Sequence, residues 1–210
     1  MINNMIYSYK EIKKIIVVTV IVFMLFGFIC NTGDAAFIQI IKAYEMFLLP
    51  FMGCWSISGF VDFVDSETRE VFLSYSRSRM TIGLIRILSL TLGFIFLCTL
   101  LFWGTFFGEN INRIYFVGIC AEIFFWSSLG YLLIMTLRNI MVSISIIWIY
   151  TAIQILDVQH YFKIISIYVY DCDGVDSIIL KTVLLFILSG LLAIIAQKRF
   201  SIMTIDGISE

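Results

Sequence analysis

The sequence predicts an all-α polytopic membrane protein that crosses the bilayer six times, with residues 1–210 forming a single transmembrane domain. Hydrophobic residues make up 61% of the chain and charged residues only 14%. Soluble domains contain roughly 45–50% hydrophobic and about 25% charged residues. One core of about 200 residues cannot bury this excess, because much of a folded surface must face water. The apolar residues also fall in six long runs, and the connections between these runs alternate in basic charge.

The six predicted spans cover residues 15–29, 44–60, 82–107, 115–137, 140–156 and 178–196. A span needs about 20 mostly apolar residues, and no polar or glycine-rich linker divides the runs into separate domains. The first run also fits a signal peptide, since Lys10, Lys13 and Lys14 precede it and a small-x-small site follows at residues 33–35. We favour a transmembrane span, because an even number of spans leaves both termini on one side of the membrane.

Basic residues determine the predicted orientation, because cytoplasmic connections carry an excess of lysine and arginine. With the N-terminus inside, the cytoplasmic set is Lys10, Lys13, Lys14, Arg69, Arg77, Arg79, Arg86, Arg138, Lys198 and Arg199. The outer set is Lys42, Arg113, Lys163 and Lys181. Most of the 14 basic residues therefore lie inside, which predicts a multi-pass protein of the plasma membrane with both termini in the cytoplasm.

Two segments outside the spans have helical or interfacial character. Residues 2–12 predict a helix lying in the inner membrane interface, with apolar residues at helical spacing and polar residues on the other side. The alternative is that Ser8 and Glu11 form a capping box that begins the first span. Residues 157–177 predict an outer re-entrant or interfacial segment, because about a dozen apolar residues are too few to span. The acidic residues near its end lack the spacing of a calcium loop.

The connection at residues 63–79 predicts a short helix parallel to the membrane. An aspartate–serine pair can cap its start, Glu67 and Glu70 fall in its first turn, and Arg77 and Arg79 lie near its end. This order of charges matches the helix dipole. The apolar positions on or beside one face are Val64, Val71, Phe72, Leu73 and Tyr75. The alternative is a solvated basic connector with no partner.

Catalytic and nucleotide-binding patterns are missing from the sequence. The chain has no P-loop motif, no aspartate within a span and a single histidine, His160. We therefore do not expect an enzyme, a metal site or a cofactor in this chain, and a net charge of −1 argues against nucleic-acid binding. The five cysteines have no CxxC spacing. Cys30 and Cys172 are both expected near the outer surface, and whether they pair stays open.

Glu122 is the one charged residue predicted deep within a span. A carboxylate there costs roughly 2.5–3.5 kcal/mol on insertion scales, so it should face protein or a wet cavity. It is either a residue of a transport pathway or subunit interface, or a structural group that accepts a hydrogen bond from the indole of Trp126 one turn on. Lys42 and Glu45, three residues apart, predict a local ion pair at the outer interface.

This layout resembles the ABC-2 type permease family, the membrane subunits of many bacterial ABC exporters. The resemblance covers the amphipathic start, the six spans, the charged cytoplasmic helix after the second span and the outer segment before the sixth. It is motif-specific over the stretch DSETRE at residues 65–70 followed by VFLSYSRSR at residues 71–79. The sequence departs from the family pattern at Glu70–Val71 and at Tyr75–Ser76, where the family commonly has Gly-Thr-Leu-Glu and a proline.

The resemblance implies that the helix after the second span is a coupling helix that docks into a separate P-loop ATPase. The implied contact residues are Glu67, Glu70, Val71, Phe72, Tyr75, Arg77 and Arg79. It further implies that two permease subunits, identical or paralogous, work with two ATPases, which hold the ATP and magnesium. The expected function is export of a peptide, drug or lipophilic substrate, with a role such as antimicrobial-peptide export or immunity.

Two other functions remain open from the sequence. A proton-coupled secondary transporter would use Glu122 as a relay, although such proteins usually bury more than one ionisable group. A non-transporting membrane assembly or sensor protein would have no ligand path.

Overall fold

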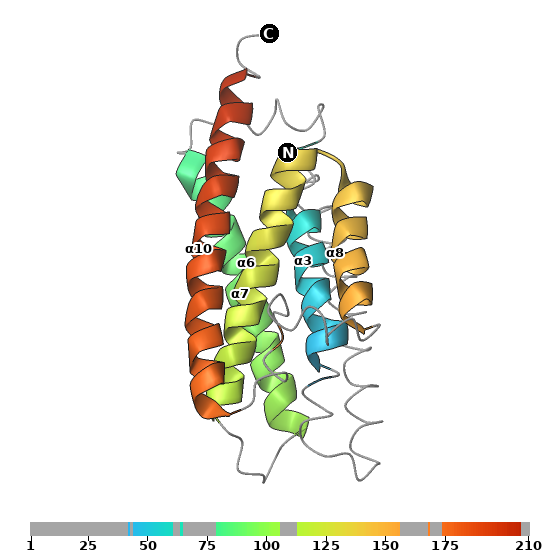
Figure 1. The fold of residues 1–210 in the computed structure, drawn as a ribbon. Coiled ribbons are helices and arrows are strands. Elements are labelled where there is room, and N and C mark those ends of the chain that lie inside the picture. The colour runs from blue at the N-terminus through green and yellow to red at the C-terminus, as the bar shows by residue number, and fades with distance from the viewer. Residues whose placement is uncertain are drawn as a thin grey trace.

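The computed structural model describes residues 42, 44–60, 64, 79–105, 113–155, 168 and 174–206. Every element in this part of the chain is helical, and these residues contain no strand. A π-helical turn, η1 (Tyr44–Leu48), leads directly into α3 (Leu49–Gly59). The other helices are α6 (Arg79–Thr105), α7 (Arg113–Leu137), α8 (Ile140–Ile155) and α10 (Val175–Asp206), which form an elongated bundle (Figure 1).

Local sequence explains where several of these helices begin and end. Pro50 lies in the first turn of α3, where its missing N–H would have no intrahelical partner. A connection of two residues, Arg138 and Asn139, separates α7 from α8. Arg138 has a positive φ of 51°, and Asn139 Oδ1 accepts a hydrogen bond from the Val142 N–H at 3.1 Å. Asn139 therefore caps α8 and the chain reverses direction sharply.

Helices α3 and α7 run in the same direction. Ser56 Oγ donates to the carbonyl of Ser127 at 2.8 Å. Four residues further along each helix, Phe60 stacks on Tyr131 with ring centroids 4.3 Å apart. Advancing along α3 therefore also advances along α7.

The remaining helices alternate in direction with their neighbours in the chain. Helix α6 runs against α7, since Thr91 pairs with Ser127 while Gly83 abuts Tyr131. Helix α8 runs against α3, and α10 runs with α7. The contacts that define these directions are Trp148 with Phe51, Ile147 with Gly53, Phe186 with Phe124 and Gln197 with Tyr131. Successive helices that alternate in direction are the arrangement that repeated membrane crossings require.

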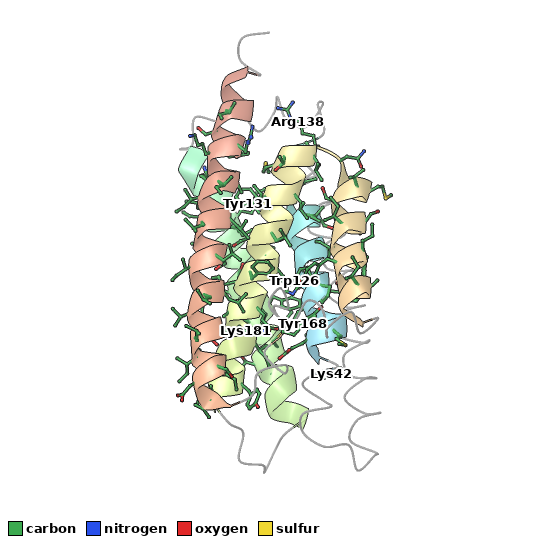
Figure 2. All side chains as sticks on the ribbon, in the orientation of Figure 1. Lys42, Trp126, Tyr131, Arg138, Tyr168 and Lys181 are labelled. Carbon is green, nitrogen blue, oxygen red and sulfur yellow. The ribbon has the colours of Figure 1, made fainter. Side chains whose placement is uncertain are left out.

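The bundle therefore has two ends of different composition. One end carries Arg138 and the other carries Lys42, with Tyr131 nearer the Arg138 end (Figure 2). Among the described residues, the basic residues of the Arg138 end are Arg79, Arg86, Arg138, Lys198 and Arg199. The basic residues of the Lys42 end are Lys42, Arg113 and Lys181. The terms Arg138 end and Lys42 end are used below.

Helix α7 is the centre of the bundle and contacts each of the other four (Figure 1). An 18-residue apolar stretch within Ile114–Leu137 is 67% buried, against 28% for Gly83–Leu100 in α6 and 22% for an 18-residue stretch within Val175–Ile202 in α10. The exposed surface of α6 and α10 is apolar, and its most exposed members are Ile85, Leu92, Phe96, Leu180, Ile187 and Ile194. Several hydroxyl side chains of these helices are buried instead, namely those of Thr91, Thr182 and Ser189. This distribution suits a hydrocarbon solvent rather than water.

Three of the described helices are long and apolar enough to cross a membrane, namely Gly83–Leu100, Ile114–Leu137 and Val175–Ile202. They coincide with the predicted third, fourth and sixth spans. The predicted fifth span forms a shorter apolar helix, Ile140–Ile153. The residues of the predicted second span form η1 and α3, and α3 has 11 residues. The predicted first span, the interfacial helix at residues 2–12 and most of the segment at residues 157–177 lie outside the described residues.

Candidate functional site

The residues that flank the predicted coupling segment lie at the Arg138 end, and most of the segment itself lies outside the described residues. Arg79 is the first residue of α6, and Val64 is half-buried and packs against the core. The other candidate contact residues fall outside the described part: Glu67, Glu70, Val71, Phe72, Tyr75 and Arg77. Helix α3 ends and α6 begins at the same end of the bundle, so both flanks of the segment lie there.

Glu122 is fully buried in α7, as the sequence predicts. The suggested hydrogen bond from Trp126 does not form, because the indole N–H of Trp126 makes no hydrogen bond with any described residue. The Trp126 ring instead packs edge-on against Tyr150 of α8, with ring centroids 5.7 Å apart, and lies beside Gly53 of α3. Packing between three helices therefore determines the position of the indole.

Glu45 is also fully buried, although the sequence predicts an interfacial position for it. Lys42, its predicted partner, is exposed. Glu45 precedes the buried residues Leu48 and Leu49 by three and four positions, a spacing that predicts one shared face in an α-helix. This spacing was the signal in the sequence that indicated burial of Glu45.

Both buried acids lie in the Lys42 half of the bundle. The contact between Ser56 and Ser127 gives the common reference level. Glu122 precedes Ser127 by five residues, and Glu45 precedes Ser56 by eleven. At a rise of about 1.5 Å per residue, these separations correspond to roughly 7 Å and roughly 16 Å along the helices. The described part of the chain contains no group of three or more His, Cys, Asp or Glu side chains that could hold a metal ion.

The hydroxyl groups of Ser56, Thr91 and Ser127 form a hydroxyl chain of hydrogen bonds, partly through backbone carbonyls, where α3, α6 and α7 meet. Thr91 Oγ1 donates to the carbonyl of Ile87 at 2.7 Å and lies 2.6 Å from Ser127 Oγ. A hydroxyl has one proton, so Ser127 must be the donor to Thr91. Ser56 donates to the Ser127 carbonyl. Every member has a partner, and the cluster joins α3, α6 and α7.

The backbones of α3 and α7 touch next to this hydroxyl chain. A Cβ added to Gly130 would lie 2.4 Å from the carbonyl oxygen of Gly53. Only glycine at position 130 permits this approach, because a methyl group there would overlap backbone rather than a movable side chain. The close crossing fixes the depth at which Trp126 faces α3.

A second polar junction lies at the Arg138 end and was not predicted from the sequence. Tyr131 Oη donates to Gln197 Oε1 at 2.9 Å, and the Tyr131 ring stacks on Phe60. The guanidinium carbon of Arg86 lies 5.7 Å from the centre of the Phe60 ring. The glutamine at the end of the apolar run of α10, directly before Lys198 and Arg199, was the only signal of this junction in the sequence.

At the Lys42 end, Lys181 of α10 donates a hydrogen bond to the backbone carbonyl of Tyr168. Tyr168 is fully buried and belongs to the predicted outer segment at residues 157–177. The contact joins this segment to the helix that follows it.

No protein-family model matches this chain, and no significant match is found among curated proteins or solved structures.

Proposed function

We propose that this chain is the membrane-spanning permease subunit of an ABC exporter and works with a separate P-loop ATPase. The observation that carries the proposal is the position of the flanks of residues 61–78. Phe60 at the end of α3 and Arg79 at the start of α6 both lie at the Arg138 end, where most basic residues of the described helices gather. Under the positive-inside rule this end faces the cytoplasm, where ATP is present.

The proposed mechanism uses the segment at residues 63–79 as a coupling helix. Val71, Phe72 and Tyr75 would provide a small apolar centre for docking, and Glu67, Glu70, Arg77 and Arg79 would set the orientation through charged contacts. ATP binding and hydrolysis in the partner would displace this helix. Helices α3 and α6, which continue from its two ends, would carry the displacement toward an outward-opening path between two permease subunits.

The complete proposed architecture has six transmembrane helices, an N-terminal interfacial helix and an outer re-entrant segment before the last span. The protein would be a multi-pass plasma-membrane protein with cytoplasmic termini, surrounded by lipid on the exposed apolar faces of α6 and α10. The second permease subunit would be an identical or paralogous chain. The substrate would be a peptide, a drug or another lipophilic compound taken from the cytoplasm or the inner leaflet.

Copurification tests the proposal directly. The detergent-solubilised protein should retain a P-loop ATPase, and the double reversal Glu67→Lys with Glu70→Lys should weaken this association while membrane insertion is unchanged. Asp176→Lys is the matched control, because Asp176 is an exposed acid in the first turn of α10 at the opposite end. If wild type and the double variant retain the ATPase equally, the contact is elsewhere. If wild type retains none, the proposal fails.

A proton-coupled secondary transporter is the second candidate, and the burial of Glu45 favours it. Such a transporter usually contains more than one buried ionisable group, and both Glu45 and Glu122 are fully buried in the Lys42 half. Dissipating the proton gradient in ATP-replete vesicles separates the two functions. Loss of transport under this treatment would favour proton coupling, whereas loss only on ATP depletion would favour the ABC exporter. Absence of any transport would favour an assembly or sensor protein.

A further inference from the structure

Both flanks of residues 61–78 contact the same side chain, that of Tyr131. Phe60, the last described residue before the segment, stacks on the Tyr131 ring with centroids 4.3 Å apart and planes 27° from parallel. Gly83, one turn into α6 after the segment, lies against the hydroxyl group, since a Cβ added to Gly83 would be 2.6 Å from Tyr131 Oη. Phe60 and Tyr131 are both fully buried. The two helices that the segment joins therefore converge on one phenol.

Tyr131 also connects these flanks to α10. Its hydroxyl donates to Gln197 Oε1 at 2.9 Å, and Gln197 lies between the buried residues Ala196 and Phe200 of α10. A Cβ added to Gly83 would also lie 2.2 Å from Gln197 Oε1. The hydrogen bond between α7 and α10 is thus pressed against the α6 backbone, with no side chain between them.

The two flanks are linked to each other as well. The Arg86 guanidinium of α6 lies over the Phe60 ring of α3, with 5.7 Å between the guanidinium carbon and the ring centre. A cation over an aromatic face is attracted by the electron density of the ring. The end of α3 and the start of α6 are therefore expected to move together.

We propose that Tyr131 is the positioning residue that transmits displacement of the coupling helix to α7 and α10. This inference rests on the proposed function, because it assumes that an ATPase displaces residues 63–79. Packed side chains resist compression, so a shift of Phe60 or Gly83 must move the phenol. The hydrogen bond to Gln197 then carries the shift to α10, because a directional bond resists sliding of one helix along another in a way that apolar packing does not.

Tyr131→Phe is the variant that separates transmission from packing. It keeps the ring stacked on Phe60 and removes only the hydroxyl that donates to Gln197. The measurement uses the full chain with its copurified ATPase in proteoliposomes of phosphatidylethanolamine and phosphatidylglycerol. A single cysteine at Ile202→Cys, on the exposed surface of α10, is labelled with N-ethylmaleimide with and without ATP and vanadate, in a background lacking the native cysteines.

The expected result is that trapped nucleotide changes the labelling rate at position 202 in the otherwise unsubstituted chain. In Tyr131→Phe this change should fall about 5- to 10-fold, the factor by which loss of one hydrogen bond shifts an equilibrium. Bound ATPase and basal ATP hydrolysis should persist. Gln197→Leu should give the same loss, and combining it with Tyr131→Phe should add nothing, because both remove the same bond.

Thr182→Val is the matched control. It removes a buried hydroxyl of α10 that donates only within its own helix, to Ile178, so the nucleotide response should remain. A wild-type-like response in Tyr131→Phe would overturn the inference and leave the proposed function standing. Lack of a nucleotide response at position 202 in the unsubstituted chain would also overturn it. If no ATPase copurifies, both fail. Should Tyr131→Phe not fold, Gln197→Leu decides by the same criteria.

Discussion

Two carboxylic acids in the apolar interior distinguish this chain at the level of single residues. Glu122 lies on central helix α7 and Glu45 on the turn before α3, and both are fully buried. Burial of an acid within a membrane bundle requires neighbouring polar groups or a wet cavity. Because Glu122 and Glu45 differ in depth, substitutions can examine them separately.

Replacing Glu122 with glutamine should leave the protein folded, because the amide preserves volume and hydrogen-bonding capacity. We expect a change in unfolding free energy of no more than about 1 kcal/mol, measured by thermal denaturation in detergent. ATP-driven transport should continue under the proposed function. Complete collapse of ATP-independent, proton-driven transport in Glu122→Gln would instead support the proton-coupled candidate.

Gly130→Ala tests the close crossing of α3 and α7. The added methyl group would lie 2.4 Å from the Gly53 carbonyl oxygen, so the helices must separate at a cost of about 1–3 kcal/mol. Gly93→Ala is the control, because a Cβ at Gly93 meets no atom within 4 Å. It should be neutral or stabilise by up to about 1 kcal/mol. Equal thermal stability of the two variants would contradict the crossing.

At the level of elements, the connection between α7 and α8 depends on one cap. Asn139 Oδ1 accepts the Val142 N–H at 3.1 Å at the start of α8. Asn139→Ala should therefore lower the unfolding free energy by about 1 kcal/mol, measured by thermal denaturation. Ser145→Ala is the control, since the exposed Ser145 hydroxyl bonds only within α8. A similar small effect from both substitutions would show that the cap contributes little.

At the level of the whole molecule, the length of α10 and the position of its basic residues indicate how the bundle lies in the bilayer. Helix α10 has 32 residues and is roughly 48 Å long, whereas the hydrocarbon core is about 30 Å thick. Its C-terminal part carries Lys198 and Arg199 at the Arg138 end, where charged side chains can reach the headgroups.

The orientation of the bundle can be tested by labelling from outside the cell. In a background lacking native cysteines, Asp176→Cys at the Lys42 end should react with an impermeant maleimide in intact cells. Asn139→Cys at the Arg138 end should react only after permeabilisation. Both positions are exposed, and the positive-inside rule gives the direction. The reverse pattern would invert the topology and remove the coupling segment from the side that contains ATP.

The sequence predicted the bounds of the helices closely where hydrophobicity alone determines those bounds. The predicted spans at residues 115–137 and 140–156 correspond to α7 (Arg113–Leu137) and α8 (Ile140–Ile155). It also predicted burial of Glu122, because a charge in a long apolar run has few other places to lie. It did not predict the complete burial of Glu45, since residues near the end of an apolar run can lie at the interface or inside.

The sequence by itself determined the helical class and the apolar exterior of this protein, because both follow from composition and run length. Only the tertiary structure decided which side chains meet across helices. One junction draws on four different helices or helix ends, through Tyr131, Phe60, Gly83 and Gln197. No small-residue motif in the sequence pairs Gly130 with Gly53. Such junctions depend on the register between helices distant in the chain, and periodicity within one helix contains no information about that register.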